Sequence, residues 1–259
     1  MKKLLLHGDC LEEMKKIPDG SIDAIITDPP YGTTACKWDS VIPFDLMWEQ
    51  LNRVIKPNGA IVLFGSEPFS SALRMSNIKM YKYDWIWSKD TKSNFPQANH
   101  QPLNNIENII VFSKGYARNF PKGSSKLSML MTYNPQFTEG NCYKLPNPSK
   151  TTEIFNLNHK NGIYKHKEKD TTKRFPFSTL NINALKGKSK LHPTQKPVAL
   201  IEYLIKTYTN EGELVLDFTS GSGTTAIAAI NTKRKWVCIE KDIGYCDNTT
   251  RRIEEVICK

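Results

Sequence analysis

Residues 214–231 read LVLDFTSGSGTTAIAAIN and place a glycine-rich loop between a short apolar run and a helical pattern. The apolar run Leu214–Asp217 predicts a buried strand, and Thr224–Asn231 predicts a helix. A second apolar run, Lys235–Ile239, follows after three residues. Because two strands joined by a helix form a parallel β-α-β unit, this stretch indicates an α/β fold.

The same alternation of strands and helices continues on both sides of a middle segment. Strands are predicted at 3–6, 22–27, 60–64, 83–87 and 109–112, and helices at 10–17, 44–55, 68–75, 197–208 and 245–257. This order predicts a single doubly wound, mostly parallel sheet. Ligands of such sheets bind beyond the carboxyl ends of the strands, so the residues that follow each strand form the candidate site.

The composition is that of a globular protein. Its 259 residues suffice for one large α/β domain, and 39% hydrophobic residues suffice for a core. We find no run of about 18 apolar residues, which excludes a transmembrane helix, and the early leucines lead into an acid instead of a signal sequence. The six cysteines lack the spacing of zinc sites or disulfide frameworks. We therefore expect no metal and a reducing, cytoplasmic location.

The net charge of +10 is concentrated in residues 114–190, which hold 15 Lys and Arg against 4 Asp and Glu. This segment shows little periodicity and interrupts the predicted sheet. A solvated or partly disordered insertion is one interpretation. The other is a surface that binds a polyanion, with nucleic acid as the first candidate.

The glycine-rich loop after Asp217 is a candidate nucleotide site. Its glycines allow a ligand close to the backbone, and the following helix N-terminus favours anionic groups. Gly221, Gly223 and Ala226 fit a dinucleotide fingerprint, and Glu240 lies 17 residues beyond Gly223, where an acid can bind ribose hydroxyls. The loop is not a P-loop, because Gly-Lys-Ser/Thr is missing. A plain strand–helix turn is the alternative.

A second unusual strand exit is TDPPYG, Thr27–Gly32. Pro29 and Pro30 stiffen the turn, and Pro29 biases Asp28 towards extended backbone. A rigid turn can aim the Asp28 carboxylate and the Pro29 carbonyl at one point, where two acceptors suit an –NH₂ donor. Tyr31 can stack on a flat ring. The stretch predicts a cage for the amino group of an aromatic base; a turn without chemistry is the alternative for the tetrapeptide alone.

Together these motifs resemble the circularly permuted β class of amino-methylating DNA methyltransferases. In that class a catalytic Asp-Pro-Pro-Tyr comes first, a target-recognition region second and the loop for S-adenosylmethionine (AdoMet) last. This chain has the same order: Asp28–Tyr31, the basic segment, His192–Pro197 (HPTQKP, typical of the class) and Asp217–Thr225. The resemblance spans nearly the whole chain outside the middle segment.

The resemblance implies a Rossmann-like domain with an insertion: a catalytic half at 1–113, a basic target-recognition region at 114–190 and an AdoMet-binding half at 191–259. It also implies which residues act. The target base would be held by Asp28, Pro29, Pro30 and Tyr31. The cofactor would be held by Asp9, Cys10, Thr194, Lys196, Asp217, Phe218, Ser220, Gly221, Ser222, Gly223, Thr224 and Glu240.

The resemblance gives these cofactor residues separate parts of the ligand. The methionine part would be framed by Asp217, Phe218 and Ser220–Thr224. Thr194 and Lys196 would lie near its carboxylate, and Glu240 would bind the ribose. The adenine would meet Asp9 and Cys10, the latter through its backbone. Three side chains have structural alternatives. Asp9 and Thr194 can each cap the helix that follows, and Phe218 can be an ordinary core residue.

The same resemblance favours adenine N6 as the target, because an initial Asp in the motif leans towards adenine and an initial Ser towards cytosine N4. Cytosine N4 stays an alternative. A nicotinamide-dependent oxidoreductase would explain the glycine loop and leave Asp28–Tyr31 without a role. An inactive DNA-binding protein is disfavoured, because every catalytic position is filled. The partners implied are DNA, a second copy of the chain and a cognate restriction endonuclease, with no membrane.

Overall fold

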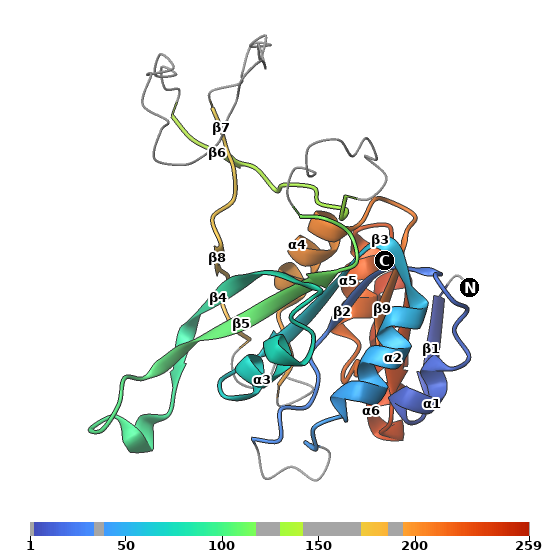
Figure 1. Ribbon diagram of the computed structural model, residues 1–259, viewed down its shortest axis with the longest axis horizontal. Coiled ribbons are helices and arrows are strands. Elements are labelled where there is room, and N and C mark those ends of the chain that lie inside the picture. Colours follow the sequence, from blue (N-terminus) through green and yellow to red (C-terminus); the bar gives the residue numbers. More distant parts are fainter. Residues whose placement is uncertain (1–2, 34–38, 118–129, 142–171, 186–193, 259) are drawn as a thin grey trace. The chain divides into compact units, whose positions relative to one another are not determined.

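The computed structural model describes residues 3–33, 39–117, 130–141, 172–185 and 194–258 (Figure 1). Contacts within the chain define two compact units. The larger unit joins Met1–Asn134 to Ser178–Lys259, and the smaller unit is Pro135–Phe177. The predicted insertion, 114–190, is therefore divided between the two units. Its first part, up to Asn134, and its last part, from Ser178, belong to the larger unit. Target recognition by 114–190 stays a prediction.

The larger unit contains an eight-stranded sheet in the order β1-β10-β9-β2-β3-β5-β4-β8. Five neighbouring pairs are parallel, and the pairs β3–β5 and β4–β5 are antiparallel. This confirms the predicted mostly parallel α/β fold. The strands are β1 (Lys3–His7), β2 (Ile22–Thr27), β3 (Ile55–Gly65), β4 (Tyr81–Ser93), β5 (Asn104–Ser113), β8 (Thr179–Asn181), β9 (Leu214–Asp217) and β10 (Lys235–Glu240).

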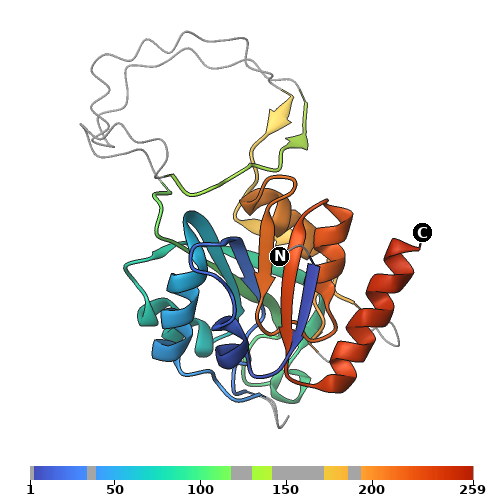
Figure 2. The ribbon, with the colours of Figure 1, turned by 90° about the vertical axis from the view of Figure 1, so that its right-hand side faces the viewer.

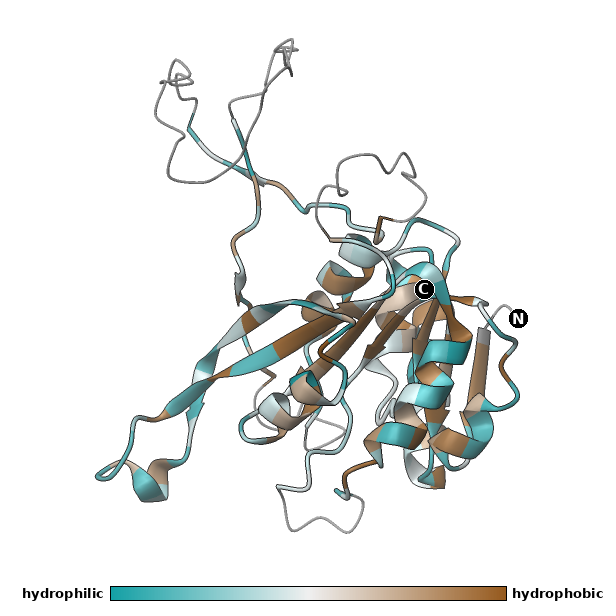
Figure 3. Ribbon diagram, in the orientation of Figure 1, coloured by the Kyte–Doolittle hydropathy of each residue, from teal (hydrophilic) through white to brown (hydrophobic). Residues whose placement is uncertain are grey.

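Helices cover both faces of this sheet (Figure 2). Alternate strand residues point to opposite faces, so Ile25 packs with α1, α2 and α3, whereas its neighbour Ile26 packs with α4 and α5. The apolar centre and the more polar outer surfaces are visible in Figure 3. The helices are α1 (Cys10–Met14), α2 (Phe44–Val54), α3 (Phe69–Ser76), α4 (Val198–Tyr208), α5 (Thr224–Asn231) and α6 (Ile243–Ile257).

Several element boundaries differ from the sequence prediction. The first helix ends at Met14 instead of residue 17, because the next residues form tighter turns in which Ile17 N–H donates to the Met14 carbonyl. Helix α2 ends before Pro57, which favours extended backbone in the preceding residue. Strands β4 and β5 are longer than expected, because their polar outer ends continue as a hairpin.

The smaller unit contains a short antiparallel pair of strands, β6 (Thr138–Glu139) and β7 (Lys173–Arg174). Beside this pair the rings of Phe137 and Phe175 lie with their centroids 4.8 Å apart. Among the helices that the structure describes, none has both the length and the apolar character needed to cross a membrane.

Candidate active site

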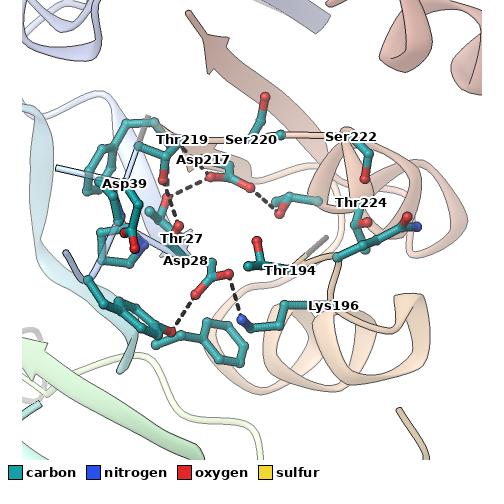
Figure 4. Close-up of a pocket in the computed structure, with 18 of the residues that line it drawn as sticks. Thr27, Asp28, Asp39, Thr194, Lys196, Asp217, Thr219, Ser220, Ser222 and Thr224 are labelled. Atoms are coloured by element: carbon teal, nitrogen blue, oxygen red, sulfur yellow. Dashed lines mark hydrogen bonds and ion pairs between the residues drawn. The ribbon is translucent and has the colours of Figure 1, made fainter. Parts of the chain in front are cut away.

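The exits of four parallel strands meet around one cavity of about 1190 Å³. Strands β1, β10, β9 and β2 are neighbours, so their carboxyl ends lie side by side. Figure 4 shows part of this edge, where Asp28 after β2 and Thr219 after β9 lie near each other and Lys196 lies beside Asp28. The predicted site residues that line the cavity are Asp9, Cys10, Asp28, Pro29, Pro30, Tyr31, Thr194, Lys196, Asp217, Phe218, Ser220, Gly221, Ser222, Thr224 and Glu240. Gly223 is the predicted residue outside this lining.

Gly223 serves the turn and the packing behind it. Its φ is 72°, in the left-handed region that favours glycine, and it begins helix α5. A Cβ atom there would lie 2.3 Å from Thr249 Cγ2 on α6. The glycine is therefore needed to bring the loop against α6, a structural role that differs from the predicted close approach to a ligand.

Asp217, the last residue of β9, holds the glycine loop in place through hydrogen bonds. Its Oδ1 accepts hydrogen bonds from Thr27 Oγ1 at 2.8 Å and from the Thr219 N–H at 3.2 Å, and its Oδ2 accepts one from Thr225 Oγ1 at 2.5 Å. Burial raises the pKa of Asp217 to about 6, although these hydrogen bonds oppose the shift. With both oxygens engaged, this carboxylate fixes the shape of the loop.

Glu240 closes the loop from strand β10. Its two carboxylate oxygens accept hydrogen bonds from the Gly221 N–H at 2.7 Å and from the Asp242 N–H at 2.9 Å. Each carboxylate oxygen can accept a further hydrogen bond, so Glu240 can hold the loop and still bind a hydroxyl. Burial raises its pKa.

Two loop hydroxyls are buried without an oxygen or nitrogen partner in the part of the chain that the structure describes. They are Ser220 Oγ and Thr224 Oγ1, and both residues line the cavity. A buried hydroxyl without a strong hydrogen bond is costly, and for Ser220 the Cys238 thiol is only a weak partner. Such groups fit a polar ligand that supplies the missing partners, as a nucleoside cofactor with an amino-acid tail would.

The residues that follow β1 also line the cavity. Asp9 Oδ1 accepts a hydrogen bond from the Leu11 N–H at 3.0 Å and caps helix α1, as one alternative predicted. Burial raises the pKa of the Cys10 thiol to about 11, so the thiol is uncharged at neutral pH. Thr194 is exposed at the cavity and does not cap α4, whose N-cap is Pro197. His192 and Pro193 lie outside the described residues.

Asp28 lies at the centre of a buried charge cluster. Lys196 Nζ is 2.6 Å from its Oδ2, and the Tyr31 hydroxyl donates to its Oδ1 at 2.5 Å. Burial raises the pKa of Asp28, the Lys196 ammonium opposes this, and the charge of Glu107 adds to it. Lys196, which was predicted to bind the cofactor, thus contacts the turn that was predicted to be catalytic.

Glu107 on β5 was missed by sequence reasoning and completes the cluster. Its Oε1 lies 2.9 Å from Lys196 Nζ and 2.7 Å from the Tyr31 hydroxyl, and its Oε2 lies 2.6 Å from Lys89 Nζ. Burial opposes its ionisation, but the two ammonium groups outweigh this effect and lower its pKa to about 2. Lys196 and Tyr31, which both contact the Asp28 carboxylate, therefore each have a second carboxylate, that of Glu107, within hydrogen-bonding distance.

The turn is also held by its ring and its backbone. The Tyr31 ring stacks on Phe69 with centroids 5.0 Å apart and an interplanar angle of 25°, so one of its faces is covered. The Asp28 carbonyl accepts a hydrogen bond from Thr219 Oγ1 at 3.1 Å. Because Thr219 belongs to the glycine loop, this contact ties the two predicted sites together. Stacking of Tyr31 on a base stays a prediction.

Comparison with known proteins assigns the family. A family model described as DNA methylase, covering N6 and N4 amino-methyltransferases, matches residues 22–251. The chain belongs to this family. It is therefore an AdoMet-dependent DNA methyltransferase, as the order of motifs predicted, and the nicotinamide alternative is wrong.

Two relatives match almost the whole chain. DNA adenine methyltransferase YhdJ of Escherichia coli K12 is 29% identical over 97% of this chain and 83% of its own length. Type II methyltransferase M.HpaI of Haemophilus parainfluenzae is 26% identical over 98% of this chain and 75% of its own length.

Solved structures share the fold. The M1.HpyAVI–SAM complex has a TM-score of 0.59 at 22% identity, covering 96% of this chain and 98% of that chain. The PvuII DNA methyltransferase, which is cytosine-N4-specific, has a TM-score of 0.66 at 17% identity, covering 99% and 91%. At these identities the likeness concerns the fold alone.

Proposed function

We propose that this methyltransferase modifies the exocyclic N6 amino group of adenine in DNA, and that it does so on a base extruded from the duplex. The observation that carries the proposal is the Asp28 carboxylate at the wall of the cavity that also contains the glycine loop. The similarity to a relative named as a DNA adenine methyltransferase supports adenine. The initial Asp of the motif supports it as well.

The residues of the loop fit the cofactor. Ser220 and Thr224 would supply hydroxyl groups to it, Glu240 would bind its ribose, and Asp9 and Cys10 would border its base. AdoMet supplies an electrophilic methyl group when it is bound. The chain's own task is to hold the target nitrogen in line with that group, which can account for a large part of the acceleration.

Asp28 and the Pro29 carbonyl would accept the two protons of the target amino group. That nitrogen is a poor nucleophile, because its lone pair is delocalised into the ring. Two acceptors favour a more tetrahedral nitrogen and stabilise the positive charge that develops on it. Asp28, whose pKa is raised by burial, can then receive the proton that the nitrogen must lose.

Glu107 would make Asp28 available to the base. Lys196 and Tyr31 occupy the Asp28 oxygens, and a buried ammonium or hydroxyl cannot simply lose its partner. Each of them is also within 2.9 Å of Glu107 Oε1. The two donors can therefore shift towards Glu107 when an amino group reaches Asp28. In this proposal Glu107 is a positioning residue.

The target base is tested by nucleoside mass spectrometry of DNA methylated by the purified protein. We expect N6-methyladenine. N4-methylcytosine in its place would overturn the adenine assignment, and sequencing of the same DNA for modified positions identifies the recognised sites. The second copy of the chain, the restriction endonuclease and the cytoplasmic location stay predictions.

The first prediction concerns Thr224. Replacing it with valine keeps its shape and removes a buried hydroxyl that has no oxygen or nitrogen partner among the described residues. The protein without ligand should keep or slightly raise its melting temperature. AdoMet should bind about 2- to 10-fold more weakly, since one hydrogen bond contributes about 0.5–1.5 kcal/mol. Calorimetry of AdoMet binding and a thermal melt measure the two effects; an unchanged affinity would remove Thr224 from the cofactor site.

The second prediction concerns the basic insertion. Affinity for DNA should fall steeply with salt, because bound phosphates release counterions. Neutralisation should reduce the slope of log K against log salt by about one for each side chain that contacts phosphate. The residues to be replaced with glutamine are Lys165, Lys167, Lys169, Lys173 and Arg174, of which Lys173 and Arg174 lie among the described residues.

A matched control replaces five exposed lysines of the larger unit that do not line the cavity. They are Lys15, Lys16, Lys206, Lys233 and Lys235. The control should leave the slope nearly unchanged, although it removes the same net charge. Equal slopes for the two variants would place the DNA path outside the insertion.

A further inference from the structure

Strands β4 and β5 form a hairpin whose outer part lines the active-site cavity. Lys89, Thr91, Lys92 and Ser93 on one strand and Asn104 on the other line the cavity. Beyond this point the hairpin continues past the rest of the sheet (Figure 1). Ser93 pairs with Asn104, and the register shifts between Ser88 and Ser93. Shifts of this kind are common beside active sites, where they redirect a strand.

The tip of this hairpin, residues 94–105, has an unusual composition. It reads NFPQANHQPLNN, in which six of the twelve residues are Asn or Gln and none is Lys, Arg, Asp or Glu. Gln97, Asn99, Gln101 and Asn104 are exposed. A surface loop that needs only solubility is usually charged. Amide side chains instead offer a donor and an acceptor in one plane.

An aromatic ring stands at the start of the same tip. Phe95 is 63% exposed and begins a single 3₁₀ turn, Phe95–Gln97. The turn is held by hydrogen bonds from the Gln97 N–H to the Asn94 carbonyl and from the Ala98 N–H to the Phe95 carbonyl, both 3.1 Å. Asn94 adopts a left-handed conformation, with φ of 71°. An apolar ring is thus presented to solvent on an ordered support.

We propose that the β4–β5 tip is a DNA-contacting element that works beside the target base, with Phe95 packed against exposed base faces and the amides at base edges. This inference rests on the proposed function. Apolar side chains that enter a base stack help to open it, and Asn and Gln pair with adenine edges through N6 and N7. A surface that does not bind DNA would not need both an exposed aromatic ring and a group of amide side chains next to the cavity.

The position of Phe95 suits this role. It lies two residues beyond Ser93, which lines the cavity, so the two Cα atoms are at most about 7 Å apart. Successive bases of one strand are about 3.4 Å apart along the axis, so the ring can lie roughly two bases from the extruded one. The exposed Lys92 at the cavity can meet the phosphate between them.

The tip and the insertion contribute to DNA binding in different ways. The tip carries no Lys, Arg, Asp or Glu, so its contacts release no counterions and are independent of salt. The basic insertion should determine the salt slope. Loss of Phe95 should therefore lower affinity for DNA equally at all salt concentrations.

The test compares Phe95→Ala and Phe95→Trp with Ile257→Ala. Ile257 is 55% exposed and ends α6, which packs against β1 and β10 at the other end of the sheet. Three quantities are measured: affinity for DNA against salt, fluorescence of 2-aminopurine at the target position, and calorimetric affinity for AdoMet.

Phe95→Ala should bind DNA on the order of 10-fold more weakly with an unchanged salt slope, and should give a smaller extrusion signal that recovers when the target base is mispaired. Phe95→Trp should restore binding, and affinity for AdoMet should stay constant. Wild-type affinity and extrusion in Phe95→Ala, or an equal loss in Ile257→Ala, would overturn the proposal. The affinities for DNA and for AdoMet need no methyl transfer, so they are separate from the choice between adenine and cytosine. The extrusion signal uses 2-aminopurine in place of adenine and therefore applies to an adenine target.

Discussion

Asp28→Ala is expected to lower methyl transfer by about 10²–10³-fold, the effect of removing one well-placed polar group from a transition-state site, while AdoMet binding is preserved. The substitution removes one of the two acceptors aimed at the target nitrogen. It leaves the glycine loop intact, since Thr219 bonds to the carbonyl of residue 28 and not to its side chain. The cluster should also survive, because Lys196 keeps Glu107 as its partner at 2.9 Å.

Single-turnover methylation and calorimetry separate these two effects. Asp28→Asn provides the matched control, because it keeps the size of the side chain and one acceptor oxygen but loses the charge. We expect its rate to lie between those of the wild type and Asp28→Ala. A wild-type rate in Asp28→Ala would mean that the Asp-Pro-Pro-Tyr segment is only a turn.

The sequence was sufficient for those parts of the fold that local patterns encode. Leu214–Asp217 and Thr224–Asn231 have the predicted bounds, because a short apolar run and a glycine loop leave one arrangement. The strands of the β4–β5 hairpin are longer than predicted. Lys89 to Ser93 and Asn104 to Ile106 are polar or exposed, so they show no apolar periodicity, and they form strands because each segment pairs with the opposite one. Strand β8 depends likewise on a parallel pairing with β4 across the chain.

The same limit applies to the site. Motifs in the chain located Asp28 and the loop, but Glu107 reaches Tyr31 across 76 residues of sequence. One signal was available: Glu107 is the single acid in the strand NNIENIIVFS, and alternation places it on the same face as Ile109 and Val111. An acid on a buried face requires a cationic partner, and the sequence does not say that Lys89 and Lys196 provide it.

Lys196→Met tests which of two roles that lysine performs. In the structure its ammonium lies between Asp28 and Glu107 and opposes the rise in the Asp28 pKa. An opposite charge at this distance shifts a carboxyl pKa by about 1–3 units. Without the ammonium, the pKa of Asp28 should rise further, so a larger share of Asp28 should be protonated. Methyl transfer at pH 7 should then fall roughly 10- to 100-fold, because the protonated acid has lost its charge as an acceptor.

The two roles of Lys196 can be distinguished by the direction in which the rate and the stability of Lys196→Met change with pH. Its rate should rise with pH, because more Asp28 ionises. Its stability should change in the opposite direction: a carboxyl whose pKa is higher in the folded state than in the unfolded state favours folding at low pH, and this advantage is lost as the pH rises through the folded-state value. Single-turnover rates and melting temperatures between pH 6 and 9 measure both. If Lys196 instead served mainly the AdoMet carboxylate, affinity for AdoMet would fall and the two pH profiles would follow the wild type. Asp217 and Glu240, whose pKa values are also raised, are present in the wild type as well. Opposite slopes that appear in Lys196→Met and not in the wild type are therefore the result expected if Asp28 must ionise to act.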